Sequence, residues 1–148
     1  MDINGVWKGE YSVHRHLFPT GKEIPVPFVM KLNSLGENRF VPLDSGLLEG
    51  ICQDDPVISK IAFHATISGS FQHELIYFVK QYPMLIIQNA EGGVTTYDQL
   101  HPEIFYSGEL KGDDEYRGTW LMHRTFRKIN GKLSELMEMR GSWRMKKY

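Results

Sequence analysis

The sequence predicts an all-β protein: a single antiparallel up-and-down β-barrel of about eight strands, with residues 1–148 forming one domain. Three observations favour this fold class. Apolar and polar side chains alternate along most of the chain, helical patterns are scarce, and every tryptophan follows a glycine by two residues. Together these features are typical of strongly coiled strands around a narrow interior.

The size and charge of the chain narrow the class further. A length of 148 residues is enough for one domain to bury a real core. The 17 basic and 18 acidic side chains give a net charge of −1, so we expect no nucleic-acid partner. The sole cysteine, Cys52, excludes an intrachain disulfide and a cysteine-rich zinc site.

The N-terminal segment lacks the basic start and the apolar stretch of a signal peptide. No apolar run approaches the roughly 20 residues that a membrane-spanning helix needs, and the C-terminus carries no lipidation motif. We therefore expect a soluble, cytoplasmic protein that does not contact a membrane. A secreted mature chain that has lost its signal would show the same pattern.

The first predicted strand opens the chain. From Ile3 to Val13 the odd-numbered positions are apolar or glycine, whereas the even-numbered positions are polar apart from Val6. One buried face explains this alternation. The pattern returns in six later segments: 28–32, 61–71, 76–82, 106–110, 116–122 and 139–145. The proline-rich segment 18–27 and the pair Gly92-Gly93 predict loops.

The pair Asn130-Gly131 is the strongest local turn signal, because it favours a two-residue hairpin loop. Such a loop fixes the register of the strands on both sides, starting with Ile129 opposite Lys132. The same register places an indole across from a glycine twice, a device of tightly curved sheets. The predicted pairs are Trp120 with Gly141 and Trp143 with Gly118, and on the outer face Arg117 with Arg144.

A second hairpin is predicted around a turn at Gln72-His73, although these residues have no strong turn preference. In this register Phe71 pairs with Glu74, and Gly69 faces Ile76.

The glycine–tryptophan spacing occurs at Gly5-Val6-Trp7, Gly118-Thr119-Trp120 and Gly141-Ser142-Trp143. Residues two apart share one face of a strand, so the glycines allow coiling while the rings fill the interior. In this pattern the chain resembles the calycin group of small β-barrels. The opening segment 3–11 looks like the first strand of lipocalins and avidins, and the recurrence in the last strands is more avidin-like. The resemblance implies a barrel that binds a small ligand, without implying which ligand.

The candidate ligand site is the inward-facing set of side chains, because small barrels hold ligands in their interior and mouth. Phenol and indole rings supply apolar area and can also satisfy a partly polar ligand. The alternative is that these rings only fill the core. We predict that a small apolar or amphipathic molecule is lined by Trp7, Tyr11, Phe78, Lys80, Tyr82, Tyr106, Trp120 and Trp143.

Lys80 is the unusual member of this set, since its position predicts that it points inward between Phe78 and Tyr82. A buried ammonium needs a carboxylate, a hydrogen-bond network or an anionic ligand. It could bind a carboxylate or, with a lowered pKa, form an imine. The alternative is a lysine at the barrel rim whose amine reaches water.

Other polar residues have simpler interpretations. Cys52 is predicted to face inward as a small hydrophobe, and Asp54-Asp55 before Pro56 predicts a turn. Segment 14–16 places His14 and His16 on one face of a strand, with Glu23 as a third possible metal ligand. Because that face is the outer one, we interpret them as surface residues and predict neither a metal nor a cofactor.

Leu75, Tyr77 and Val79 occupy the outer face of their predicted strand, so we hypothesise a homo-oligomer that buries them. Three functions stay open. The preferred one is a non-enzymatic binder of a small ligand, and the alternative is a protein-interaction module with a side-chain-filled barrel. An isomerase- or cyclase-type enzyme is the weaker alternative, because no catalytic acid–base pair is apparent and a barrel fold alone does not imply activity.

Overall fold

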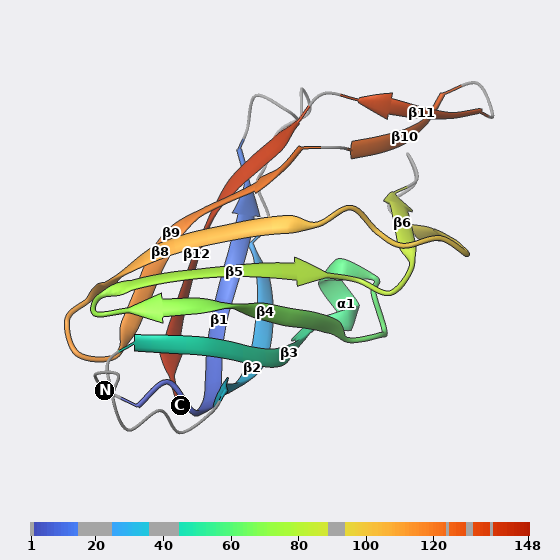
Figure 1. The fold of residues 1–148 in the computed structure, drawn as a ribbon. Helices are drawn as coiled ribbons and strands as arrows, with labels where there is room; N and C mark the ends of the chain where they lie inside the picture. Colours follow the sequence, from blue (N-terminus) through green and yellow to red (C-terminus); the bar gives the residue numbers. More distant parts are fainter. Residues whose placement is uncertain are drawn as a thin grey trace.

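The computed structural model describes residues 2–14, 25–35, 45–88, 94–123, 125–129, 132–136 and 138–148. Within them, eight strands close an antiparallel barrel in the order β1-β12-β9-β8-β5-β4-β3-β2. Each barrel strand pairs with the next one along the chain, as Figure 1 shows, so the predicted up-and-down barrel is confirmed. The strands are β1 (Gly5–Val13), β2 (Val26–Leu35), β3 (Ser45–Asp54), β4 (Ala65–Gln72), β5 (Leu75–Gln81), β8 (Ile104–Lys111), β9 (Glu115–Met122) and β12 (Met139–Lys147).

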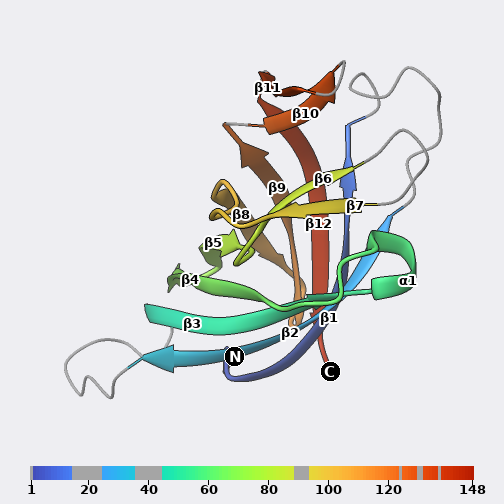
Figure 2. The same cartoon turned by 90° about the vertical axis from the view of Figure 1, so that its right-hand side faces the viewer.

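Two short hairpins and one short helix lie between the barrel strands. The hairpin of β6 (Leu85–Gln88) and β7 (Val94–Tyr97) separates β5 from β8, and the hairpin of β10 (Thr125–Ile129) and β11 (Lys132–Leu136) separates β9 from β12. Helix α1 (Pro56–Ser59) joins β3 to β4. All of them lie at one end of the barrel, here called the hairpin end, and both chain termini lie at the other (Figures 1 and 2). No helix in the described part of the chain is long and apolar enough to cross a membrane.

The register predicted from Asn130-Gly131 is confirmed on both sides of the hairpin. Ile129 pairs with Lys132 in β10–β11, and the same register continues through β9 and β12. The turn residues themselves lie outside the described residues. Both predicted indole–glycine pairs are present: Trp120 with Gly141 and Trp143 with Gly118.

The glycines give the indoles room to reach the backbone of a neighbouring strand. A Cβ on Gly141 would lie 1.9 Å from the carbonyl oxygen of Ser12 and 2.2 Å from Trp120 Nε1. Without that Cβ, Trp120 Nε1 donates a hydrogen bond of 2.9 Å to the Ser12 carbonyl. Each such pair therefore ties three strands together through a ring and a backbone carbonyl.

The unfavourable outer pair, Arg117 opposite Arg144, is also present. Each arginine turns away to a glutamate. Arg144 Nε donates to Glu10 Oε1 at 3.0 Å, and Arg117 Nε lies 3.2 Å from Glu115 Oε1. The like charges are thereby compensated at the surface.

The predicted register of β4 and β5 is wrong by two residues. Gln72 pairs with Leu75, so the turn is His73-Glu74, and Gly69 faces Phe78 instead of Ile76. His73 takes a φ of 53°, a left-handed conformation that is uncommon for residues with a side chain. A Cβ on Gly69 would lie 2.6 Å from the Cα of Phe78. The close approach of a glycine to an aromatic residue thus fixes this hairpin as well.

Aromatic rings fill the middle of the barrel and its termini end. Trp7 and Tyr116 contact with ring centroids 5.4 Å apart, and Trp7 Nε1 donates to the Ile3 carbonyl at 2.9 Å. Further along, Phe78 stacks on Tyr106 at 4.8 Å, and Trp143 packs edge-on against Phe78 at 5.4 Å. Space for a ligand must therefore be sought towards the hairpin end.

Candidate functional site

A buried ion pair lies inside the barrel near the hairpin end. Lys80 is the second-last residue of β5, and Asp54 is the last residue of β3. Lys80 Nζ lies 2.7 Å from Asp54 Oδ1, and the two side chains are 1% and 0% exposed. The interpretation of Lys80 as a rim lysine in water is therefore wrong, and the buried alternative with a carboxylate partner holds.

Asp54 accepts hydrogen bonds on both carboxylate oxygens. The Tyr82 hydroxyl donates a short hydrogen bond to Oδ2, and the Tyr11 hydroxyl lies at a longer 3.4 Å from the same oxygen. The Cys52 thiol lies 3.8 Å from Oδ1, the oxygen that also binds Lys80. These five residues are called the Lys80–Asp54 cluster below.

Aromatic faces surround the ammonium group. Lys80 Nζ lies 4.7 Å from the ring centroid of Tyr11 and 5.0 Å from that of Tyr82. The rings of Phe28 and Tyr106 are 5.9 and 6.0 Å away. Desolvated cation–π contacts of this kind are favourable, so the rings help to hold a charge that water cannot reach.

The cluster sets the protonation of its members. Burial alone would lower the pKa of Lys80, but the Asp54 carboxylate in direct contact outweighs burial and raises that pKa above its ordinary value. Burial raises the pKa of Tyr11 and of Cys52 to about 12. Near neutral pH the lysine is therefore charged and the phenol and thiol keep their protons. This protonation disfavours imine formation, which needs a neutral amine.

His101 borders the cluster in the segment before β8. Its ring lies 5.2 Å from the Tyr82 ring at a steep angle, and its Nδ1 lies 2.8 Å from the Pro102 carbonyl oxygen. Burial lowers the pKa of His101, which favours a neutral imidazole. No local pattern in the sequence predicts a role for His101.

The structure separates the predicted lining residues into two groups. Tyr11, Lys80 and Tyr82 belong to the cluster, Tyr106 lies beside it, and Trp120 contacts Tyr11 with ring centroids 6.4 Å apart. The packed aromatic interior contains Trp7, Phe78 and Trp143.

Asp54 is the functional candidate that sequence reasoning missed, and its interpretation as a turn residue is corrected here. Asp55 makes the local turn instead, since its Oδ1 accepts from the backbone N–H of Val57 at 2.9 Å at the start of α1. Asp54 shares the strand parity of Cys52, which was predicted to face inward. That parity indicates that Asp54 faces inward, but the strong turn preference of Asp-Asp-Pro favoured the other interpretation.

Half-buried apolar side chains lie at the hairpin end of the barrel. They pack against the core yet keep part of their surface exposed. Phe63 contacts Tyr82 with ring centroids 6.2 Å apart. We call this set the mouth: Tyr11, Val13, Phe63, Ile86, Met122 and Met139.

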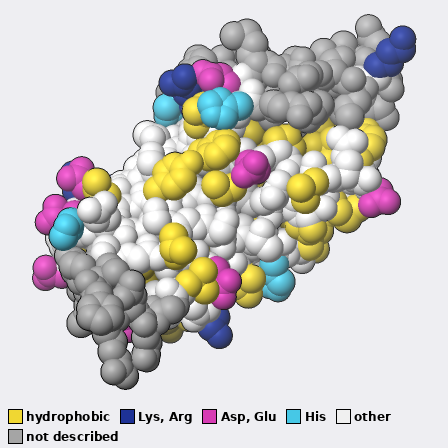
Figure 3. Space-filling model, in the orientation of Figure 1, with side chains coloured by type: hydrophobic (Ala, Val, Ile, Leu, Met, Phe, Trp, Pro, Cys, Tyr) yellow, Lys and Arg dark blue, Asp and Glu magenta, His cyan; other side chains and the backbone are white. Residues whose placement is uncertain are grey.

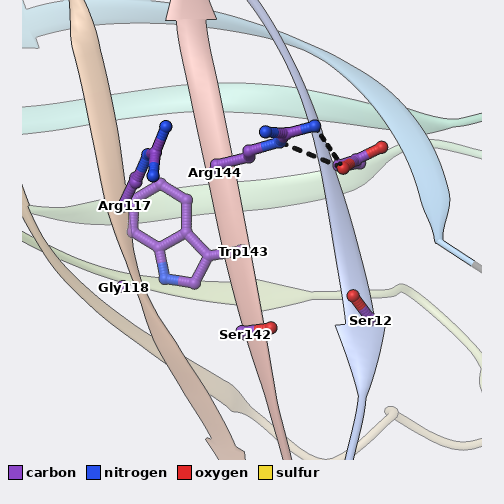
Figure 4. Close-up of a pocket in the computed structure, with 7 residues that line it drawn as sticks. Ser12, Arg117, Gly118, Ser142, Trp143 and Arg144 are labelled. Carbon is purple, nitrogen blue, oxygen red and sulfur yellow. Dashed lines mark hydrogen bonds and ion pairs between the residues drawn. The ribbon is translucent and has the colours of Figure 1, made fainter. Parts of the chain in front are cut away.

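Two of the hollows in the described part of the chain lie on the outer wall. One, of about 320 Å³, is bordered by Glu10, Ser12, Ser142 and the two arginines (Figure 4), whose guanidinium groups are directed to glutamates. The other, of about 470 Å³, crosses β5, β8, β9 and β12 and includes Tyr77, Phe105 and Leu121. No residue of the Lys80–Asp54 cluster lines either hollow.

The outer face of β5 is exposed, as its alternation predicts. Leu75 is 60% and Tyr77 45% exposed, while Val79 is half-buried. Figure 3 shows separate hydrophobic groups over the face where β4 and β5 lie. The homo-oligomer through these residues stays a prediction.

His14, His16 and Glu23 were weighed as metal ligands, and of these His16 and Glu23 lie outside the described residues. Among the described residues, no group of three or more histidine, cysteine, aspartate or glutamate side chains is placed to hold a metal ion.

Comparisons with known proteins found no matching family model, no matching curated protein and no matching solved structure. The class of this protein therefore rests on its structure alone. It is a closed eight-stranded antiparallel barrel, and its described interior contains a lysine–aspartate ion pair.

Proposed function

We propose that the barrel binds one small apolar or amphipathic molecule at its mouth, in contact with the Lys80–Asp54 cluster. The observation that carries this proposal is the ion pair itself, which is buried among aromatic rings. Withdrawing two charges from water costs several kcal/mol per ion, and apolar side chains of similar volume often give equal or greater stability. The presence of an ion pair at this depth therefore favours a role for the pair in ligand binding over a role in packing.

The mouth supplies the apolar part of the site. Met122 and Met139 pair across β9 and β12, and Phe63 lies against Tyr82. Methionine side chains adapt to ligands of different shape. The stacked rings of Phe78 and Tyr106 form the floor, so a ligand would lie above them with its polar end near Tyr11 and Lys80.

The Gly-x-Trp pattern and the barrel topology support placing the chain among calycin-like, lipocalin- or avidin-like barrels. In such barrels a ligand enters at an open end, which agrees with the position proposed for the mouth. Membership of that group is part of the proposal.

A dye titration tests the proposal. Nile red, an uncharged dye whose emission rises in apolar surroundings, is expected to saturate at one dye per chain. Met139→Glu should weaken this binding strongly, because it places a charge at the mouth. Leu75→Glu, the same kind of change on the exposed outer wall, should leave it unchanged.

Near-ultraviolet circular dichroism checks that both variants keep the packed aromatic interior. Failure of Nile red to saturate would contradict the proposal, and so would equal loss of binding in the two variants.

A second candidate function, self-association through the outer face, is favoured by the exposure of Leu75 and Tyr77. Val79 pairs with Phe105, and Phe105 with Leu121, so apolar side chains cross three neighbouring strands. Light scattering at micromolar concentration should then give the mass of an oligomer, and Tyr77→Arg should dissociate it. A monomeric mass for the unaltered chain would remove this candidate. The enzymatic alternative gains a carboxylate beside Lys80, but it stays the weaker alternative because a barrel fold alone does not imply activity.

A further inference from the structure

We infer that the molecule bound at the mouth presents an uncharged hydrogen-bond acceptor to Lys80, such as a ketone, amide, ester or alcohol oxygen, and not a carboxylate. This inference rests on the proposed function and specifies the chemistry of its ligand. Two properties of the Lys80–Asp54 cluster carry it: its charge balance and its count of hydrogen-bond donors and acceptors.

The charges of the cluster already cancel. Lys80 and Asp54 are in direct contact at 2.7 Å and are shielded from water. Because burial raises the pKa of the surrounding phenols and of the Cys52 thiol, these groups add no charge near neutral pH. A carboxylate ligand would therefore bring one uncompensated negative charge into a site without water, which is strongly unfavourable.

The acceptor capacity of Asp54 is filled. A carboxylate offers about four acceptor positions. Asp54 receives Lys80 and Cys52 on Oδ1 and Tyr82 and Tyr11 on Oδ2. A hydrogen-bond donor on the ligand would have to displace one of these four partners.

Lys80, in contrast, has donors to spare. An ammonium group carries three N–H donors, and among the described residues Asp54 Oδ1 is the oxygen that accepts one of them. The Cys52 sulfur is a weak second acceptor, and the ring faces of Tyr11 and Tyr82 lie nearby. The site thus has more hydrogen-bond donors than acceptors. A carbonyl or ether oxygen on the ligand would accept a hydrogen bond from the unused donor.

Tyr11 is the side chain that would move to admit this oxygen. It is only partly buried, and its bond to Asp54 is long at 3.4 Å, whereas Tyr82 is fully buried and tightly bonded. The Tyr11 ring lies 4.7 Å from Lys80 Nζ and also packs edge-on against the ring of Trp120. Displacement of Tyr11 exposes the ammonium without breaking the ion pair.

Competition between matched ligands tests the inference. The uncharged 2-octanone and 1-octanol and the anion octanoate share one chain length and differ in their polar end. Each is titrated against Nile red bound to the unaltered protein at neutral pH. We expect 2-octanone to bind at least about tenfold more tightly than octanoate. Octanoate affinity should rise as the pH falls, and calorimetry in two buffers of different ionisation enthalpy should detect proton uptake.

Asp54→Asn provides the matched variant, because it removes the compensating charge and keeps the side-chain shape. The affinity for octanoate should then rise relative to the affinity for 2-octanone, because the ligand carboxylate replaces the lost charge beside Lys80. The unaltered protein carries the main comparison, so the test does not depend on the folding of this variant.

The outcomes separate the inference from the proposed function. Octanoate that binds the unaltered protein as tightly as 2-octanone, without proton uptake, would overturn the inference and leave the binding function standing. If neither Nile red nor any of the three compounds binds, the proposed function fails and the inference fails with it.

Discussion

At the residue scale, Lys80 and Asp54 depend on each other. Replacing Lys80 by methionine leaves the Asp54 carboxylate buried without a counter-ion. Breaking a buried ion pair from one side costs about 3–5 kcal/mol, so Lys80→Met should lower the free energy of unfolding by that amount. Urea denaturation monitored by circular dichroism measures it.

A double variant separates lost charge balance from lost packing. Lys80→Met combined with Asp54→Leu restores neutrality, and its unfolding free energy should recover most of the loss. The exposed Lys111 of the Lys111–Glu109 pair is the control, since removing an exposed ion pair changes stability by about 1 kcal/mol or less. A double variant as unstable as Lys80→Met alone would show that lost packing or hydrogen bonding, and not an uncompensated charge, causes the loss.

Also at the residue scale, His101 should make the free energy of unfolding depend on pH. Burial lowers the pKa of His101 in the folded state below its ordinary value of 6.5. As the pH falls below 6.5, the unfolded chain takes up a proton at this residue before the folded protein does, so stability decreases. Unfolding free energies measured from about pH 8 to about pH 5 should show this decrease.

His101→Gln should remove part of that slope, whereas His64→Gln, a change at an exposed histidine, should not. A slope that persists in full after His101→Gln would assign the pH dependence to other groups.

Strand parity predicted the inward direction of Lys80 but not the identity of its partner. Asp54 and Asp55 are adjacent, and the sequence Asp-Asp-Pro has a strong local preference for a turn. Only the tertiary structure distinguishes them: Asp55 caps α1, while Asp54 points into the barrel and meets Lys80 of β5, two strands away in the sheet. A partner 26 residues away in the sequence is beyond the reach of local patterns.

At the scale of the elements, the indole–glycine pairs hold strands β9 and β12 in register. Gly141→Ala would place a Cβ 1.9 Å from the Ser12 carbonyl oxygen and 2.2 Å from Trp120 Nε1. The strands must separate or the indole must move, so we expect a loss of about 1–3 kcal/mol in unfolding free energy.

Urea denaturation of Gly141→Ala checks this loss, and Ser142→Ala is the control on the exposed side of the same strand. The control should stay within about 0.5 kcal/mol of the unaltered protein. Equal stability of Gly141→Ala and Ser142→Ala would contradict the role given to the glycine.

The two hairpins show what limits register prediction from sequence. Asn130-Gly131 strongly prefers one turn type, so the register predicted for β9 and β12 was correct. Gln72-His73 has no such preference, and the register predicted for β4 and β5 was wrong by two residues. The pairing of Gly69 with Phe78 follows the same glycine–aromatic rule as the tryptophans, so that rule is the better guide where a turn is ordinary.

At the scale of the whole molecule, alternation and glycine spacing predicted a closed barrel of the observed size. They could not predict which end of the barrel is filled and which end is the mouth. That property depends on how strands separated in sequence are staggered around the barrel, and on the two hairpins and α1 that gather at one end. The proposed ligand site is therefore smaller than the predicted set and is shifted towards the hairpin end.

The most direct test of ligand binding at the mouth is native mass spectrometry of the protein purified without denaturant from expressing cells and then supplied with 2-octanone. We expect one small molecule per chain, retained or taken up on addition, and lost on denaturation. Leu75→Glu should keep this additional mass and Met139→Glu should lose it. A bare polypeptide mass for the unaltered chain, both before and after 2-octanone is added, would contradict the proposed function.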